Sequence, residues 1–335
     1  MGEVLLAIDV GGSTSRAYLV DRTGNCLGQG RSRGGNPASN NPDFAAASII
    51  AAVEAAVADA GGGPFDIVVA QIALAGPQAH VALARLEEAF RRLGLSGDIV
   101  FAGDLLAMFA SITPAMDGYC VVAGTGAGVI RIRGGEIDRV VDLAGWQLGD
   151  LGSGYWLGHE AAKAAVAEME GRGEQTALTP ALLDALKIPN GGDGVQGRSL
   201  PLRLFIDAIY ALRPIELARF APLVIAHRGD AVADALIAEA ERYLVRDFTI
   251  AFDPSVPGPV VLGGGVIAHL NGLAGAIAEV VRQAGLEPDI RTVTDGSVGA
   301  IVLALRAIGV PVDEAMLNRI AASVAAHSAG AVVSV

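Results

Sequence analysis

Residues 5–30 read LLAIDVGGSTSRAYLVDRTGNCLGQG, and this stretch decides the fold class. An apolar strand delivers Asp9 and is followed at once by Gly11 and Gly12. A dinucleotide-binding fingerprint would continue from its glycines into a helix, whereas residues 15–20 alternate as a second strand. We therefore interpret the stretch as an antiparallel hairpin with the glycines at its tip. A turn at residues 23–25 then leads into a third strand.

The same pattern occurs a second time, at residues 119–141, which read YCVVAGTGAGVIRIRGGEIDRVV. Its glycine tip falls at residues 124–126, and its second turn falls at residues 134–135. Both copies are strand, tip, strand, turn and strand, and helices and further strands follow each of them. Two copies of one meander predict two related lobes of mixed α/β structure, with the order of strands in each sheet left open.

Hydrophobic periodicity predicts the other elements, and the repeat predicts the division into lobes. We predict an N-terminal lobe at residues 1–112, with residues 297–335 packing back onto it, and a C-terminal lobe at residues 113–296. The pattern predicts helices at residues 43–60, 80–93, 154–170 and 231–252, and strands at residues 67–75, 98–102 and 260–262.

Composition narrows the classes of partner. The chain has 335 residues, 52% of them hydrophobic, and a formal net charge of −12, which disfavours nucleic acid and anionic membranes. No apolar run approaches the ~20 residues that span a bilayer, and the first residues enter a strand without a basic leader. Cys26 and Cys120 lack metal-binding spacing and are expected to be ordinary reduced thiols. We expect a cytoplasmic protein that binds neither nucleic acid nor membrane.

Four motifs in a fixed order carry a resemblance to a known family. They are DVGGST at residues 9–14, AGTGAG at 123–128, GWQLGDLGSGYWLG at 145–158 and LGGGV at 262–266. The chain resembles the actin-type sugar kinases, specifically the N-acetylglucosamine kinase branch of the BadF/BadG/BcrA/BcrD ATPase family. The resemblance covers nearly the whole chain. It implies an α/β protein with two lobes of actin-like, ribonuclease-H-like fold and a cleft between them.

The resemblance implies that three glycine-rich segments bind ATP. A tip without side chains lets backbone N–H groups approach phosphates closely, and glycine can also adopt positive φ. Neighbouring hydroxyl groups add donors, and the third segment resembles the family's adenosine-binding turn. The alternative for either tip is a plain tight hairpin. The residues expected to bind ATP are Gly11, Gly12, Ser13, Thr14, Gly124, Thr125, Gly126, Gly263, Gly264 and Gly265.

Two aspartates are candidates for the chemistry itself. Asp9 ends a buried strand, where a carboxylate is costly unless it meets a cation or hydrogen-bond donors, so Mg²⁺ is expected there. A structural cap is the alternative. Asp104 follows a strand and precedes a helical pattern, which by position alone suits an N-cap as well as a catalytic base. The resemblance places the base at this position, where it would take the proton from a sugar hydroxyl.

Sugar recognition requires polar groups that converge on neighbouring hydroxyls. The resemblance assigns this role to Asn36, Gly145 and Asp150, together with Asp104. Asn36 could instead be a turn residue, and Asp150 could belong to the start of a helix. Leu151 stands where the family commonly has glutamate, so no sugar contact is carried over from that position.

These observations predict an ATP-dependent kinase that phosphorylates the 6-hydroxyl of N-acetylglucosamine, with ATP and Mg²⁺ as cofactors. Glucosamine or glucose is the alternative acceptor, and a non-catalytic sugar sensor is the rival class. A reductase-activating ATPase of the same family would need paired cysteines for an iron–sulfur cluster, which the two cysteines do not supply. The expected partners are the amino sugar and ATP, and a homodimer is one of the assembly states left open.

Overall fold

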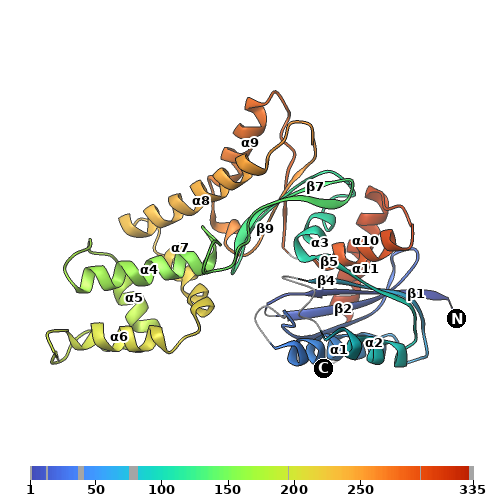
Figure 1. The fold of residues 1–335 in the computed structure, drawn as a ribbon, viewed down its shortest axis with the longest axis horizontal. Helices are drawn as coiled ribbons and strands as arrows, with labels where there is room; N and C mark the ends of the chain where they lie inside the picture. The colour runs from blue at the N-terminus through green and yellow to red at the C-terminus, as the bar shows by residue number, and fades with distance from the viewer. Residues whose placement is uncertain are drawn as a thin grey trace. The chain divides into compact units, whose positions relative to one another are not determined.

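A computed structural model of the chain describes residues 2–12, 14–36, 41–74, 82–194, 196–294 and 296–331. Two compact units make up the chain (Figure 1). The first consists of Met1–Cys120, Gly134–Glu136 and Arg291–Val335, and the second consists of Val121–Arg133 and Ile137–Ile290. Segments from both ends of the chain therefore build the first unit.

The first sheet has five strands in the order β3-β2-β1-β4-β5. β1 pairs antiparallel with β2 and parallel with β4, so the sheet combines a meander with a parallel edge. Its first hairpin confirms the interpretation of the opening stretch, because β2 follows β1 across the glycine tip. The strands are β1 (Glu3–Val10), β2 (Thr14–Asp21), β3 (Cys26–Arg33), β4 (Asp66–Leu74) and β5 (Leu95–Gly103).

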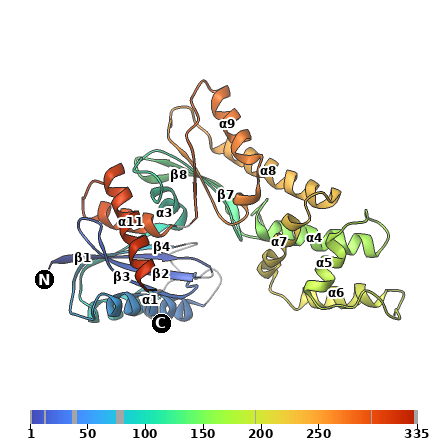
Figure 2. The same ribbon diagram turned by 180° about the vertical axis from the view of Figure 1, so that it is seen from behind.

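Helices cover both faces of the first sheet (Figures 1 and 2). α1 and α2 pack on one face, α3 and α10 pack on the other, and α11 packs against β3. The helices are α1 (Pro42–Asp59), α2 (Leu83–Arg92), α3 (Asp104–Ala110), α10 (Ser297–Ala307) and α11 (Glu314–Ala331).

β1 is the central strand, and seven of its eight residues are buried. Successive side chains of a strand point to opposite faces. Leu6 and Ile8 accordingly join the apolar cluster that includes Ile49 and Val53 of α1. Asp9 follows Ile8 and therefore points to the face covered by α3 and α10.

The second sheet repeats the strand order of the first. Its five strands have the order β8-β7-β6-β9-β10. In both sheets the first strand of the meander therefore lies between the other two meander strands and the two strands that come later in the chain. The shared order confirms that the sequence contains two copies of one unit. The strands are β6 (Gly118–Ala123), β7 (Ala127–Arg133), β8 (Glu136–Asp142), β9 (Val260–Gly263) and β10 (Ile290–Val293).

Most of the second unit is helical. α8 packs against β7, and α4 packs against η2, α5, α7 and α8. The helices are α4 (Gly154–Met169), α5 (Leu178–Ala185), α6 (Leu200–Tyr210), η2 (Pro214–Phe220), α7 (Ala221–Ala226), α8 (Ala231–Ala251), η3 (Ile267–His269) and α9 (Leu273–Gln283).

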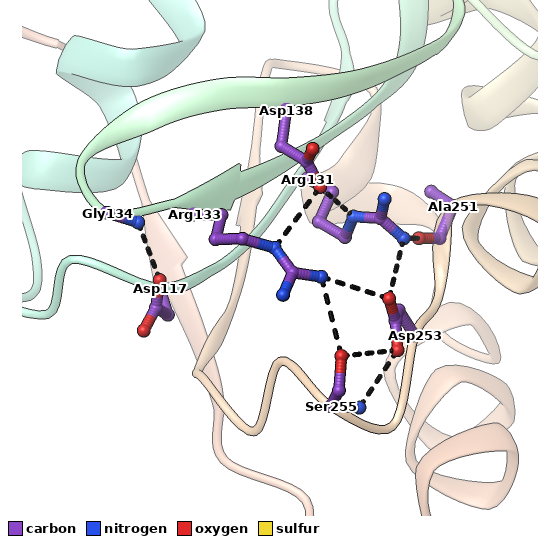
Figure 3. Close-up of polar contacts among 8 residues, drawn as sticks. All are labelled: Asp117, Arg131, Arg133, Gly134, Asp138, Ala251, Asp253 and Ser255. Atoms are coloured by element: carbon purple, nitrogen blue, oxygen red, sulfur yellow. Dashed lines mark hydrogen bonds and ion pairs between the residues drawn. The ribbon is translucent and has the colours of Figure 1, made fainter.

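An ion-pair network fastens the strands of the second unit to the end of α8 (Figure 3). Arg131 Nε lies 2.6 Å from Asp138 Oδ2, and its Nη1 donates to the carbonyl of Ala251 at 3.2 Å. Arg133 Nη2 lies 3.0 Å from Asp253 Oδ2. Asp253 also accepts from the backbone N–H and the hydroxyl of Ser255. The network fixes the β7–β8 hairpin against the segment that follows α8.

The predicted elements exist, with shifted boundaries. β5 begins at Leu95, three residues before its predicted start. The sequence hides this extension because Gly97 interrupts the strand pattern, whereas in the structure Gly97 lies so close to Val68 that an added Cβ would overlap the Val68 carbonyl. The predicted helix at residues 80–93 is α2, and residues 80 and 81 lie outside the described residues. Among the described helices, none is both long and apolar enough to cross a membrane.

Candidate active site

The first unit places Asp9 and Asp104 at one edge of its sheet. β1, β4 and β5 are parallel, and Asp9 is level with Ala73, which is level with Ala102. The carboxyl ends of these strands therefore meet at the same edge, which is where open α/β sheets bind ligands. Asp104 begins α3 two residues beyond Ala102. Both carboxylates thus lie at the carboxyl edge of this sheet.

Asp104 is the first residue of α3, but it does not cap the helix. The N-cap is Gly103, and no side-chain capping hydrogen bond is formed there. The Asp104 carboxylate accepts a hydrogen bond from the N–H of Leu105 at 3.0 Å. Burial raises the pKa of this carboxyl group, against the lowering effect of backbone hydrogen bonds. A buried carboxylate with a raised pKa is a candidate general base.

Asp9 is only 8% exposed and pairs with Arg16 on the neighbouring strand. The two residues are directly opposite in the β1–β2 ladder, and Arg16 Nη1 lies 3.3 Å from Asp9 Oδ2. Asp9 Oδ1 faces Gly296, where an added Cβ would lie 3.4 Å away. Such a distance is an ordinary van der Waals contact, so Gly296 packs beside the Asp9 carboxylate. Sequence reasoning missed Arg16, although the hairpin register alone sets it opposite Asp9.

The first glycine tip is a tight turn. The N–H of Gly11 donates to the carbonyl of Thr14 at 2.9 Å. Among the described residues, nothing lies within 4 Å of a Cβ built on Gly12. Ser13 lies outside the described residues, and Asn36 lies in the same unit, three residues beyond the end of β3.

Positive φ is not what most of the predicted ATP-binding glycines require. Among them only Gly264 has a left-handed backbone, with φ of +104°. Gly11, Gly12, Gly124 and Gly126 therefore do not use the freedom of glycine to adopt positive φ. At these positions glycine matters because it has no side chain, which leaves the backbone N–H groups accessible.

In the second unit, a pocket of about 510 Å³ brings together two of the predicted segments. Gly124 and Thr125 of the second tip line it together with Gly265 of the third glycine segment. The opposite wall is apolar, and it comes from the end of η2 and from α7: Ala218, Ala221, Pro222, Ile225 and Ala226. Sequence reasoning missed this wall, because small apolar residues on a short helix carry no signal of their own.

Hydrogen bonds fix the second tip to its surroundings. The carbonyl of Gly124 accepts from the N–H of Gly154 at 2.7 Å, and that of Thr125 accepts from the N–H of Tyr155 at 3.2 Å. The tip therefore lies at the N-terminus of α4, an end of a helix that favours anions. The N–H of Val266 donates to the carbonyl of Ala123 at 2.9 Å, which attaches the third glycine segment to the same tip.

Asp150 lies against the second tip. Its carboxylate is buried, with the residue 6% exposed, and Oδ1 accepts from the N–H of Ala127 at 3.2 Å. Burial raises the pKa of the carboxyl group. An added Cβ on Gly126 would lie 2.9 Å from Asp150 Oδ1. The helix α4 is capped by Ser153, whose side chain accepts from the N–H of Trp156, so Asp150 is not the helix-start residue.

Comparison with known proteins identifies the family. An N-acetylmuramic acid/N-acetylglucosamine kinase of Clostridium acetobutylicum is 28% identical over 232 residues, which is 65% of this chain and 71% of that protein. An N-acetyl-D-glucosamine kinase of Dictyostelium discoideum is 23% identical over 90% of this chain and 98% of its own length. The crystal structure of a candidate N-acetylglucosamine kinase from Chromobacterium violaceum has a TM-score of 0.69 and is 25% identical, covering 90% of this chain and 99% of that one.

The fold class is α/β with two lobes of the actin-like ATPase type, as the sequence predicted. Residues 6–305 match one protein family over most of the chain, including all four motifs quoted above. The chain therefore belongs to the BadF/BadG/BcrA/BcrD ATPase family.

Proposed function

We propose that this chain is an ATP-dependent amino-sugar kinase that transfers the γ-phosphoryl group of ATP to the 6-hydroxyl of N-acetylglucosamine. The names of its two curated relatives support the substrate class. The observation that carries the proposal is the placement of Asp9 and Asp104 at the carboxyl edge of the first sheet. That edge offers one carboxylate for a cation and one for a base.

Asp104 acts as the general base. As the sugar hydroxyl attacks the γ-phosphorus, its proton passes to the Asp104 carboxylate. The hydroxyl oxygen forms the new P–O bond, the bond to the bridging oxygen breaks, and ADP leaves with that electron pair. Positioning and charge neutralisation supply most of the rate in phosphoryl transfer, and the base contributes the remainder.

The glycine segments bind the nucleotide. The tip at Gly11 and Gly12 holds the β- and γ-phosphates, and the tip at residues 124–126 lies nearer the β-phosphate. The pocket beside Gly265 accepts adenosine, because its small apolar wall suits a flat base and its glycines let the base lie on the backbone.

Asp9 fits a magnesium ion that arrives with the nucleotide. Mg²⁺ keeps several waters and takes few carboxylates, so one buried carboxylate at the end of a strand is a sufficient protein ligand. Among the described residues, no group of three or more His, Cys, Asp or Glu side chains is arranged to hold a metal, as a permanent metal cage would require. When bound, the ion would neutralise charge that develops on the phosphates.

Asn36, Gly145 and Asp150 hold the sugar, together with Asp104. Leu151 in place of glutamate removes one negative charge that could have attracted the ammonium group of glucosamine. This favours the neutral acetamido group, for which Leu151, Trp146 and Tyr155 offer apolar surface. The rings of Trp146 and Tyr155 lie 5.8 Å apart.

The reductase-activating function of the wider family is not favoured by the two thiols. Burial raises the pKa of Cys26 to about 11 and also raises the pKa of Cys120. An iron–sulfur cluster binds thiolates, so both cysteines are poorly suited to hold one.

A coupled ADP-release assay over a panel of sugars tests the proposal. With saturating ATP and Mg²⁺, kcat/KM for N-acetylglucosamine should exceed that for glucosamine and glucose by at least ~10-fold, the lower end of what one buried apolar group contributes. N-acetylmuramic acid belongs in the panel because one relative is named for it. A preference for glucosamine would overturn the acetamido assignment, and no turnover with any sugar would overturn the kinase.

A further inference from the structure

The loop between β8 and α4 is closed by the carboxylate of Asp142. Asp142 is the last residue of β8. Its Oδ1 accepts from the N–H of Asp150 at 2.7 Å, and its Oδ2 accepts from the N–H of Leu151 at 3.0 Å. One side chain therefore holds the far end of an eight-residue excursion by two separate hydrogen bonds.

This loop is strained where the carboxylate acts on it. Asp142, Leu143 and Asp150 have φ of +62°, +57° and +58°. Such left-handed backbone costs a residue other than glycine free energy, and it persists only where the surroundings enforce it. Gly149 leaves room for the closure, because an added Cβ at this position would overlap Asp142 Oδ1.

The other side of Asp150 reaches the second glycine tip. Its carboxylate accepts from the N–H of Ala127, the residue after Gly126. The N–H of Leu143 donates to the carbonyl of Ala127 at 3.2 Å, so both ends of the loop contact the same residue. Asp150 is therefore held at two points. Its backbone N–H donates to the Asp142 carboxylate, and its own carboxylate accepts from Ala127 beside the tip.

α8 supports the loop from behind. An added Cβ on Gly152 would lie 2.8 Å from the carbonyl of Ala240, so the end of the loop packs directly on this helix. Asp247 of α8 is 1% exposed. Burial raises the pKa of its carboxyl group, the contacts with Arg246 lower it, and the charge of Asp142 adds to the rise. The loop therefore packs on α8 at Gly152, and the Asp142 carboxylate lies close enough to α8 to act on the charge of Asp247.

We propose that Asp142 is a positioning residue, which fixes the Asp150 carboxylate against the second glycine tip in the orientation that meets the sugar. The inference rests on the proposed function, because the contact between Asp150 and the sugar is part of it. Without the Asp142 acceptors, the loop relaxes out of its left-handed conformations and Asp150 turns away from its place. A displacement of about 1 Å can cost ~100-fold in rate.

Asp142→Asn is the variant that isolates this role. Asparagine has nearly the same size and tolerates positive φ, but its NH₂ group cannot accept from a backbone N–H. We expect kcat/KM for the sugar to fall ~10–100-fold, with ADP affinity changed less than about twofold. Asp184→Asn, on the exposed face of α5, is the matched control and should behave as wild type.

A double-mutant cycle with Asp150→Asn decides whether Asp142 acts through Asp150. If it does, adding Asp142→Asn to the Asp150→Asn protein should cost less than about twofold further, because the group it positions is already gone. Losses that multiply in the double variant would overturn the inference. Wild-type kcat/KM in Asp142→Asn alone would overturn it equally.

Amide hydrogen exchange separates this inference from the proposed function. In the free protein, the amides of residues 149–152 should exchange at least ~10-fold faster in Asp142→Asn than in wild type or Asp184→Asn. Unchanged exchange overturns the positioning role even where the kinase assay succeeds. If the wild-type protein phosphorylates no sugar, that result counts against the proposed kinase activity. The exchange rates then still test whether Asp142 holds the loop in place.

Discussion

Asp104 shows at the scale of one residue how a site is maintained at a cost to the fold. Burial raises the pKa of its carboxyl group above the ordinary 3.8, so the folded protein disfavours the ionised form. A base must be ionised to accept a proton, and a raised pKa also strengthens it. The raised pKa of Asp104 therefore destabilises the folded state and also makes the carboxylate a better base.

Asp104→Asn should separate the two effects. We expect turnover to fall by ~10²–10⁴-fold, the usual contribution of a general base, while the fold is retained. At pH 7 the variant should unfold at the same temperature as wild type or above it, because asparagine avoids the cost of a buried charge. Thermal unfolding and the ADP-release assay measure the two quantities on one preparation. Near-normal turnover would exclude the base.

The destabilisation of the folded state by Asp104 should change with pH in a definite direction. Because the folded pKa of Asp104 is raised, the penalty is full above the folded pKa and shrinks as the pH falls through it towards 3.8. The difference in unfolding temperature between Asp104→Asn and wild type should shrink with it. Wild-type turnover should fall over the same range, because the base becomes protonated.

Among the elements, the glycine tips show which features can be predicted from the sequence and which cannot. An apolar strand before Gly11 and Gly12 and alternation after them predict a hairpin, because period-two patterning is typical of strands. The pairing of Asp9 with Arg16 follows from the register of that hairpin. Which glycines need positive φ does not follow, because φ depends on how a turn closes and not on the residue type. Only the structure singles out Gly264.

Gly264 should be the glycine of the third segment that tolerates substitution least. Its φ is +104°, and an added Cβ would overlap the carbonyl of Ala123 in the second tip. We expect Gly264→Ala to lower the free energy of unfolding by ~1–3 kcal/mol, as left-handed strain does, and to weaken ADP binding as the tip shifts.

Gly265→Ala is the matched control for that variant. Nothing in the described part of the chain lies within 4 Å of a Cβ on Gly265, and its φ is not positive. The control should unfold like wild type in a denaturant titration. Equal loss of stability in both variants would show that the segment is uniformly tight and that Gly264 has no special role.

At the scale of the whole molecule, the repeat could be recognised from sequence but its topology could not. Two meanders with glycine tips are visible as patterns, because each strand is a local property of the chain. The order of strands places β4 beside β1 and β9 beside β6, and these pairings join segments far apart in the sequence. The wall of the adenosine pocket escapes detection for the same reason, since Ala221 and Ile225 are unremarkable until the fold sets them opposite Gly265.

The final prediction is that nucleotide affinity and catalysis can be impaired independently. The proposed adenosine pocket lies wholly within the second unit, whereas Asp104 belongs to the first. Ala226 is exposed and lines the pocket, so Ala226→Phe should fill part of its roughly 510 Å³ without disturbing the core. We expect ADP affinity in Ala226→Phe to fall at least ~10-fold, the effect of about 1.4 kcal/mol, with an unchanged unfolding temperature.

Asp104→Asn is the reciprocal control, because it should bind ADP as tightly as wild type while turning over slowly. Titration calorimetry of both variants with ADP measures the contrast directly. Ala226→Phe with normal ADP affinity would show that adenosine binds elsewhere, because the phenyl group would occupy part of the space that a purine in this pocket needs. A loss of ADP affinity in Asp104→Asn as large as that in Ala226→Phe would show that the carboxylate serves the nucleotide rather than the transfer step.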